Sequence, residues 1–237
     1  MLLPVLLLLA QPVPAADCGM VIASDGGGCR ECAMGDLGAD ALRYYTGADV
    51  ALLPAAELGI SLQAGPIDEQ ALAESFPTDG TIVVKTMSRE ELCALLEQGV
   101  GHITLGEDER IDEEQSASKD FFCPAGLTFC YDASAPVGER LYELETESDA
   151  EYLTVAVPAE YADGTPVGTV REAVAAWASY CGTLNPPDTG RIRVIGANDN
   201  PVIGGLLPRG LVLVFAAVAV MFGGYRWRRS MRERTER

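Results

Sequence analysis

Histidine is almost absent from this chain of 237 residues, which contains only His102. Phosphoester hydrolysis by two metal ions requires several His, Asp and Asn ligands, and a Ser–His–Asp triad requires a suitably placed histidine. We therefore expect no catalytic residue, no metal site and no cofactor in this chain, and we expect His102 to lie in a loop.

Basic residues are also scarce. The chain holds 17 Lys and Arg against 35 Asp and Glu, which gives a formal net charge of −18. Residues 17–208 are more acidic still, because ten basic residues stand against 33 acidic ones there. Such a field repels polyanions. We therefore expect no nucleic-acid partner, and we expect free nucleotides to bind only where a local basic pocket overrides the field.

Charged residues are missing altogether from residues 211–225, which read LVLVFAAVAVMFGGY. Counted from Leu206, the apolar stretch is about 20 residues long, enough to cross the hydrocarbon core of a bilayer. Arg209 can extend to the headgroups near one end, and the six arginines of residues 226–237 predict a cytoplasmic C-terminus. The pattern, preceded by Gly204–Gly205, also resembles bacterial sorting signals that are cleaved after export, so the domain is either membrane-held or released.

The N-terminus carries a short apolar run, Leu2–Ala10, followed by the small residues Ala15 and Ala16. The run is too short to span a membrane. The pattern is typical of a secretory signal peptide cleaved near Ala15 or Ala16, although no Lys or Arg precedes it. We therefore expect an exported protein whose folded domain lies on the extracytoplasmic side, in the periplasm or at the cell surface.

The length predicts one domain with short accessory segments. The predicted boundaries are a signal peptide over residues 1–16, a domain over 17–196, a linker over 197–205, a transmembrane helix over 206–225 and a basic tail over 226–237.

Helical and strand-like patterns alternate along the domain. Apolar spacing predicts helices over residues 33–45, 68–74, 88–98 and 169–180, and strands over residues 50–53, 81–87, 127–131, 141–147, 152–157 and 191–195. Ser88 and Glu91 form a capping-box pattern, and Gly99 is expected to end that helix. Residues 24–28 are expected to form a flexible lead-in, and residues 107–114 a solvated acidic loop. The order of elements predicts a mixed-sheet α/β or α+β fold.

Seven cysteines in a chain expected to be exported indicate disulfides, and the odd number leaves at least one thiol unpaired. Cys93, inside a helical pattern, is the predicted buried free thiol. Candidate pairs are Cys29 with Cys32, Cys123 with Cys130, and Cys18 with Cys29 or Cys32. The sequence does not decide between them.

Cys29 and Cys32 also form a candidate chemical site. They flank Arg30 and Glu31 at the expected N-terminus of a helix, where backbone amides and the helix dipole lower the pKa of a thiol. The pattern is compatible with a structural disulfide and with a pair that undergoes thiol–disulfide exchange.

A series of motifs runs through the domain in a specific order. They read ECAMGDL (31–37), GADVAL (47–52), GPI (65–67), TIVV (81–84), GLTFCYD (126–132), APVGERL (135–141), YLTVAV (152–157) and GRI (190–192). The series resembles the C-terminal, substrate-specificity domain of the 5'-nucleotidase family over residues 29–195. The resemblance implies that domain's fold and a relation to nucleotide catabolism. In that family the catalytic metals sit on a separate N-terminal domain, which we do not expect in this chain.

The family's substrate-contacting residues are replaced at each matching position. Family members carry Asn-Gly-Gly-Gly-Ile-Arg, whose arginine grips the substrate, but residues 54–59 read PAAELG and place Gly59 at the arginine position. Thr78 stands where the family has one aromatic plate for the base, and Ala159 stands where it has the second. Thr165 stands at the acid of the family's Gly-Gly-Asp-Gly loop.

These replacements predict loss of nucleotide binding. Each stacked aromatic contributes about 1–3 kcal/mol, and a charge-assisted hydrogen bond contributes about 1.5–3 kcal/mol. Losing them turns micromolar binding into negligible binding, and Glu57 adds repulsion toward phosphate. A repurposed pocket that uses Arg30, Arg43 or Arg140 is the alternative.

The sequence therefore favours an exported, membrane-anchored, non-catalytic module that binds a protein or a surface ligand, or serves as a scaffold. The second hypothesis is an accessory specificity domain that acts with a separate metallophosphatase in nucleotide hydrolysis. Thiol–disulfide exchange at Cys29 and Cys32 is the third.

Overall fold

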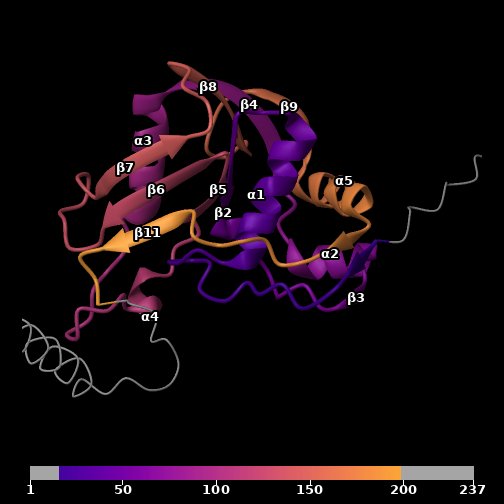
Figure 1. Ribbon diagram of the computed structural model, residues 1–237, viewed down its shortest axis with the longest axis horizontal. Helices are drawn as coiled ribbons and strands as arrows, with labels where there is room; N and C mark the ends of the chain where they lie inside the picture. Colours follow the sequence, from indigo (N-terminus) through magenta and orange to yellow (C-terminus); the bar gives the residue numbers. More distant parts are fainter. Residues whose placement is uncertain (1–15, 199–237) are drawn as a thin grey trace, which may run out of the picture. The chain divides into compact units, whose positions relative to one another are not determined.

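The computed structural model describes residues 16–198 of the chain (Figure 1). The predicted transmembrane helix and basic tail lie outside these residues, as do most of the predicted signal peptide and linker. Within residues 16–198, no helix combines the length and the apolarity needed to cross a membrane. Ala16 is buried, and its carbonyl accepts a hydrogen bond from the Ile67 N–H at 2.9 Å. The folded part therefore includes Ala16, which cleavage after Ala15 would retain.

A five-stranded mixed sheet, in the order β5-β2-β8-β4-β9, forms the centre of the fold. β2 (Val50–Pro54) runs parallel to β8 (Tyr152–Pro158) and antiparallel to β5 (Phe122–Ala125). β4 (Thr81–Ser88) runs antiparallel to both β8 and β9 (Thr165–Thr169). This combination of parallel and antiparallel pairs confirms the predicted mixed-sheet class.

Helices lie on both faces of this sheet (Figure 1). α1 (Ala33–Thr46) and α5 (Val170–Cys181) pack together on one face, and α3 (Arg89–Val100) lies on the other. The remaining helical elements of the described residues are short: the 3-10 helix η1 (Ala55–Glu57), α2 (Glu69–Ser75) and α4 (Glu113–Ser116).

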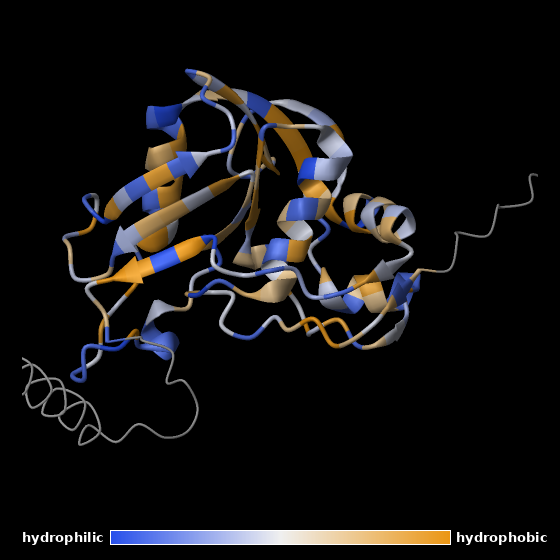
Figure 2. Cartoon of the chain, in the orientation of Figure 1, coloured by the Kyte–Doolittle hydropathy of each residue, from blue (hydrophilic) through white to orange (hydrophobic). Residues whose placement is uncertain are grey.

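Alternate residues of β2 supply the two cores that these helices cover. Ala51 and Leu53 pack in the core that contains α1, whereas Val50 and Leu52 pack in the core that contains Leu92 of α3. A strand buried on both faces needs no polar face, which is why residues 50–53 are uniformly apolar. Figure 2 shows apolar residues concentrated along the strands of this sheet.

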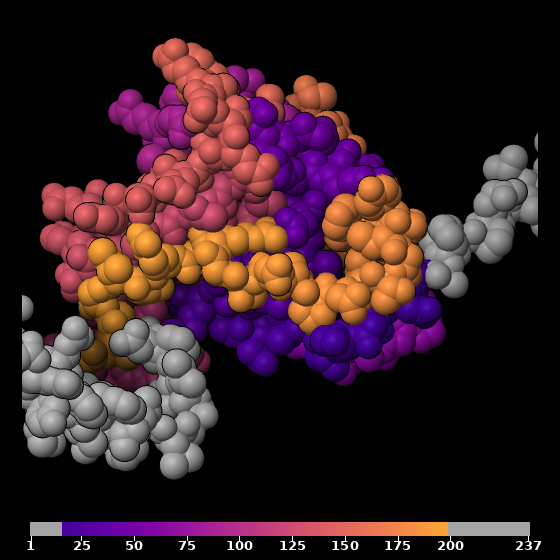
Figure 3. Space-filling view, viewed as in Figure 1, coloured from indigo at the N-terminus to yellow at the C-terminus, as the bar shows by residue number. Residues whose placement is uncertain are grey.

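Two smaller sheets complete the fold. One has the order β11-β6-β7, in which β6 (Leu127–Asp132) pairs antiparallel with β7 (Leu141–Thr146) and parallel with β11 (Ile192–Ile195). Figure 3 shows the chain after α5 crossing the surface to reach β11. The other joins β10 (Thr183–Leu184), β1 (Asp17–Cys18) and β3 (Gly65–Pro66).

Glu31 and Arg191 fix the start of β11 beside α1. The Glu31 carboxylate accepts hydrogen bonds from the N–H groups of Gly190 and Arg191 at 2.8 Å each, and from that of Ile192 at 3.2 Å. The Arg191 guanidinium donates to both carboxylate oxygens of Asp40, at 2.8 Å each. Charge-assisted bonds of this bidentate kind set a fixed geometry, so the residues around α1 hold the last described strand.

The predicted capping box is confirmed, but the predicted helix stop is wrong. Ser88 Oγ accepts from the Glu91 N–H at 3.2 Å, and Glu91 Oε2 accepts from the Ser88 N–H at 2.8 Å. α3 continues through Gly99 to Val100. Gly99 serves packing instead, because a Cβ there would lie only 2.8 Å from the carbonyl oxygen of Asp120.

Residues 24–28 form a packed turn rather than the expected flexible lead-in. Gly26 has a φ of +78°, and a Cβ on Gly27 would lie 2.6 Å from Leu58 Cδ1 and 3.1 Å from Cys32 Sγ. Glycine is therefore required here by conformation and by close approach. The acidic segment 107–114 likewise ends inside a short helix, α4, and β5 and β9 were not anticipated from the sequence.

Arg140 connects the second sheet to the end of α3. The residue is only 8% exposed, and its Nη1 donates to the carbonyls of Val100 and Ile103 at 2.7 Å each. Its Nε donates to the carbonyl of Ala135 at 3.1 Å. A buried guanidinium with this many acceptors is a structural element of the fold.

We expect Arg140→Met to lower the free energy of unfolding by about 2–4 kcal/mol, because three carbonyls lose their charged donor. Denaturant titration of the full chain measures the change. Arg193→Met is the matched control: the Arg193 side chain is 64% exposed, and an exposed ion pair contributes only about 0–1 kcal/mol. Equal losses in the two variants would contradict this role for Arg140.

Candidate functional site

Three of the four replaced family positions lie around the side chain of Glu57. Thr78 Oγ1 donates to the carbonyl of Ala56 at 2.7 Å. Gly59 lies two residues after Glu57 in the chain, and its N–H donates to the carbonyl of Ser75 at 2.8 Å. Ala159 follows Pro158, whose Cβ lies against Gly80 beside the Glu57 carboxylate. The structure thus brings Gly59, Thr78 and Ala159 to one place.

Thr165 does not share this place. It pairs with Val84 inside the central sheet, whereas the Ala159 N–H donates to the carbonyl of Thr81. Val84 is three residue steps along the strand from Thr81, which is about 10 Å at the usual rise of a strand. Thr165 is also an exposed residue of β9.

The Glu57 side chain is buried close to these positions. The residue is 0% exposed, and its Oε2 accepts a hydrogen bond from the Gly80 N–H at 3.0 Å. Its Oε1 has no hydrogen-bond partner among the described residues. A Cβ on Gly80 would lie 2.2 Å from Oε1, so glycine is needed for the carboxylate to approach this backbone amide.

Burial raises the pKa of the Glu57 carboxyl group. The hydrogen bond from the Gly80 N–H lowers the pKa, because it stabilises the charged form, but burial has the larger effect. The nearby carboxylates of Glu160 and Asp79 raise the pKa further, and the Arg171 guanidinium lowers it. The space around Glu57 is therefore rich in carboxylates, which disfavours a phosphate.

Gly59 has no room for a longer side chain. A Cβ there would lie 2.2 Å from the carbonyl oxygen of Glu74 and 2.8 Å from Pro77 Cδ. The segment that follows α2 thus occupies the space into which a side chain at position 59 would project. The arginine expected from the family pattern is excluded by the local backbone, not simply exchanged for a smaller residue.

The three arginines of the alternative pocket are each bound by other groups. Arg30 Nε lies 2.9 Å from Glu113 Oε1, and Arg43 Nη2 lies 2.6 Å from Glu147 Oε2. Arg140 is buried under the carbonyls described above. The structure therefore gives no support to a nucleotide pocket built on these arginines.

Arg171 is a cation close to Glu57, and sequence reasoning missed it. Its Nε donates to the carbonyl of Phe76 at 3.0 Å, its Nη2 donates to the carbonyl of Pro77 at 3.2 Å, and its Nε lies 3.6 Å from Asp79 Oδ2. The sequence signal nearest to Arg171 is weak: Thr169 and Glu172 form a capping-box pattern at the start of α5. The structure contains this capping box.

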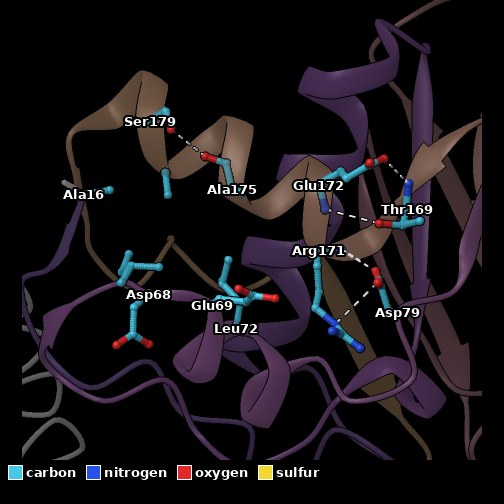
Figure 4. Close-up of a pocket in the computed structure, with 12 residues that line it drawn as sticks. Ala16, Asp68, Glu69, Leu72, Asp79, Thr169, Arg171, Glu172, Ala175 and Ser179 are labelled. Carbon is cyan, nitrogen blue, oxygen red and sulfur yellow. Dashed lines mark hydrogen bonds and ion pairs between the residues drawn. The ribbon is translucent and has the colours of Figure 1, made fainter. Parts of the chain in front are cut away.

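Arg171 also lines a cavity of about 460 Å³ between α2 and α5 (Figure 4). The apolar part of the lining comes from Ala16, Ile67, Leu72, Ala175 and Ala178. The polar part comes from Asp68, Glu69, Asp79, Thr169, Arg171, Glu172 and Ser179. Because these residues come from three distant segments, no local sequence motif could have indicated the cavity.

The described residues contain no cluster of three or more His, Cys, Asp or Glu side chains arranged to hold a metal ion. His102 is exposed, and its Nε2 lies 3.9 Å from Asp120 Oδ2. The structure therefore offers no candidate metal centre within residues 16–198.

The predicted disulfide pairs are not formed in the described residues. Cys18, Cys32, Cys123 and Cys130 carry free thiols. Cys18 donates to the carbonyl of Met20 at 2.9 Å, and Cys130 lies opposite Arg193 in the pairing of β6 with β11. Cys93 is also free but half-buried rather than buried, and burial raises its thiol pKa.

The thiol beside Cys32 is that of Cys123, not Cys29. Cys32 is the N-cap of α1, and its Sγ accepts from the Gly35 N–H at 3.3 Å. A Cβ on Gly35 would lie 3.2 Å from Cys32 Sγ and 2.3 Å from Cys123 Sγ. Cys29 instead packs in the core with α3. Pairs were predicted from closeness in sequence, whereas the pairing of β5 with β2 brings Cys123 to the start of α1.

Asp36 is buried next to this pair. Neither of its carboxylate oxygens meets a hydrogen-bond donor among the described residues. Burial and the neighbouring Glu31 carboxylate raise the pKa of Asp36 to about 9, and the protonated form can donate to Glu31. Arg191 opposes the shift. No sequence signal distinguished Asp36 from the other acidic residues.

We expect stability to fall with rising pH because of Asp36. The unfolded carboxyl releases its proton near 3.8, whereas the folded one keeps it up to about 9. Between these values the folded state binds the additional proton, so its advantage shrinks by at most about 1.4 kcal/mol per pH unit. Asp36→Asn should flatten the dependence of the melting temperature on pH between about pH 5 and pH 8.

Thermal unfolding of both full chains across this range measures the effect. Asp25→Asn, at an exposed aspartate, is the control and should leave the profile of the native protein unchanged. Parallel profiles for the native protein and Asp36→Asn would show that Asp36 does not titrate in this window.

Comparisons with known proteins agree with the fold. The chain is similar to the structure of a 5'-nucleotidase precursor from Thermus thermophilus, with a TM-score of 0.64, 22% identity, and coverage of 76% of this chain and 39% of that one. For a putative 5'-nucleotidase from Staphylococcus aureus, the TM-score is 0.62 and the identity 14%, with coverage of 77% of this chain and 40% of that one. For NAD nucleotidase from Haemophilus influenzae, the TM-score is 0.60 and the identity 12%, with coverage of 79% of this chain and 38% of that one. None of the curated proteins compared with the chain is a significant match.

This chain thus spans between 38% and 40% of the length of those three structures. At these identities the structural likeness establishes the fold. The model of the 5'-nucleotidase C-terminal domain matches residues 14–161, which is more than half of the sequence. The predicted resemblance is confirmed, and the chain belongs to the 5'-nucleotidase C-terminal domain family.

Proposed function

We propose that this chain is a non-catalytic binding or scaffold module in which the nucleotide cleft of the family has been closed. The observation that carries the proposal is the burial of Glu57 at the meeting point of Gly59, Thr78 and Ala159. The Gly80 N–H, which could otherwise face a ligand, donates to the protein's own carboxylate.

Charge around the cleft supports the same conclusion. A nucleotide phosphate would approach the carboxylates of Glu57, Asp79 and Glu160. Arg171 is close, but its guanidinium is bonded to the carbonyls of Phe76 and Pro77. Freeing it for a ligand would break two charge-assisted bonds, each contributing about 1.5–3 kcal/mol. The lost aromatic plates and the excluded arginine add to this deficit.

The cavity beside Arg171 suits a different ligand. Its apolar lining accepts hydrocarbon groups, and four acidic residues, Asp68, Glu69, Asp79 and Glu172, line it together with one arginine (Figure 4). Complementary charge favours a cationic or neutral apolar group over an anion. A protein partner that inserts a lysine or an apolar side chain is the occupant that this lining fits.

The module is proposed to act outside the cytoplasm, held by a transmembrane helix over residues 206–225 with residues 226–237 on the cytoplasmic side. The support is the uncharged stretch and the arginines that follow it.

Calorimetric titration of the full chain, kept in detergent, tests the closed cleft. We expect no heat with AMP, adenosine or a UDP-sugar at millimolar concentration. Glu57→Gln removes the charge at nearly constant shape, and we expect it to be silent as well, because position 59 still lacks an arginine. A dissociation constant below about 100 μM, near −5.5 kcal/mol, would favour the accessory specificity domain that acts with a separate metallophosphatase.

Membrane attachment has its own test. We expect the full chain, expressed in a bacterial host, to remain in the membrane fraction after alkaline carbonate washing, because about 20 apolar residues span the bilayer. A variant that ends at Gly205 should be recovered in the soluble extracytoplasmic fraction. Recovery of the full chain in the soluble fraction with residues 206–237 intact would refute the anchor.

A further inference from the structure

Cys32 and Cys123 meet across Gly35. The Gly35 N–H donates to Cys32 Sγ at 3.3 Å, and the missing side chain of Gly35 leaves the space that Cys123 Sγ occupies. The two residues come from the N-cap of α1 and from β5, which the pairing with β2 holds in place. Both are buried, at 4% and 1% exposed respectively.

We propose that Cys32 and Cys123 form a thiol–disulfide exchange site whose substrates are low-molecular-weight disulfides such as glutathione disulfide. The inference does not rest on the proposed binding function, because the reacting groups are the thiols of Cys32 and Cys123, although the cavity beside Cys32 is lined in part by Ala55, Leu58 and Gly59 of the segment around Glu57.

The two thiols differ in a way that assigns their roles. A hydrogen bond with the Cys123 thiol lowers the pKa of Cys32, and the hydrogen bond from the Gly35 N–H lowers it as well. Burial raises the pKa of Cys32 but does not outweigh these bonds. The hydrogen bond with Cys32 and burial raise the pKa of Cys123 well above its ordinary value. Because the thiolate is the nucleophile, Cys32 attacks first and Cys123 acts as the resolving thiol.

A small cavity lies on the outer side of the glycine turn that covers Cys32. It has a volume of about 290 Å³, and its lining includes Gly27, Gly28, Leu58 and Lys119. A Cβ on Gly27 would lie 3.1 Å from Cys32 Sγ, so the sulfur lies directly beneath this glycine turn. The proposed reaction requires this packed turn to move away from Cys32 Sγ, and the exposed ammonium group of Lys119 at the cavity attracts the carboxylates of glutathione disulfide.

The reaction balances without a further reactant. The Cys32 thiolate attacks one sulfur of the small disulfide, which forms a mixed disulfide and releases one small thiolate. Cys123, on losing its proton, then attacks Cys32 Sγ, which forms the Cys32–Cys123 disulfide and releases the second small thiolate. The two protons of the protein thiols end on the two small thiols. The protein pair is oxidised, and the small disulfide is reduced.

Peptide mapping of the full chain tests the proposal. The protein is reduced with dithiothreitol, exposed to glutathione disulfide, quenched with acid, alkylated and digested for mass spectrometry. We expect a Cys32–Cys123 linked peptide that appears on oxidation, disappears on renewed reduction, and is accompanied by a rise in melting temperature. Cys181→Ser is the control: Cys181 is exposed and separate from the pair, so the linked peptide should persist.

Single variants separate the roles. Cys123→Ser should accumulate a glutathione adduct on Cys32, because no resolving thiol remains, whereas Cys32→Ser should lose both the linked peptide and any adduct on Cys123. Two results with the native chain would overturn the proposal, and neither depends on the folding of a variant. One is linkage of Cys32 to Cys29, and the other is that both thiols remain open to alkylation at excess glutathione disulfide.

Discussion

The carboxylate of Glu57 is buried against the Gly80 N–H, and the surrounding loops are arranged to accommodate it. Removing a carboxylate from water is unfavourable unless hydrogen bonds replace its hydration. One oxygen has such a bond, and the other has none among the described residues. A glycine at position 80 is required for the approach, and the backbone of residues 74–77 closes over Gly59. The same interactions that bury Glu57 place its carboxylate and the backbone of residues 74–77 beside the positions where this family's substrate contacts are expected.

The central sheet beneath these loops has the fold of the 5'-nucleotidase C-terminal domain family. Alternate residues of β2 pack in the two cores, and the strand ends at Pro54. The 3-10 helix η1, which contains Glu57, follows directly and lies beside the start of β4. This arrangement depends on apolar burial and strand pairing, not on any substrate contact. A fold of this kind can lose its original ligand without losing its core, which is why family membership and nucleotide binding are separate questions here.

The sequence predicted the frame because its signals were local. The apolar run at residues 50–53 and the capping box of Ser88 and Glu91 each identify an element without knowledge of its neighbours. β5 was missed because its FCPA sequence is short and contains proline, and Gly99 was misread because its close approach to Asp120 is a tertiary contact. At the candidate site, the family pattern singled out Gly59, Thr78 and Ala159, whose relation to substrate binding stays a prediction. The burial of Glu57, the role of Arg171 and the meeting of Cys32 with Cys123 all depend on distant segments, which no local pattern encodes.

A crystal structure of the full chain grown at saturating AMP tests the closed cleft most directly, because it locates the Glu57 carboxylate and any ligand together. The account predicts that Glu57 Oε2 remains within hydrogen-bonding distance of the Gly80 N–H. It also predicts that no nucleotide is bound at the site formed by Glu57, Gly59, Thr78 and Ala159. A nucleotide bound there, with Glu57 turned out to solvent and the Gly80 N–H facing the ligand, would contradict it.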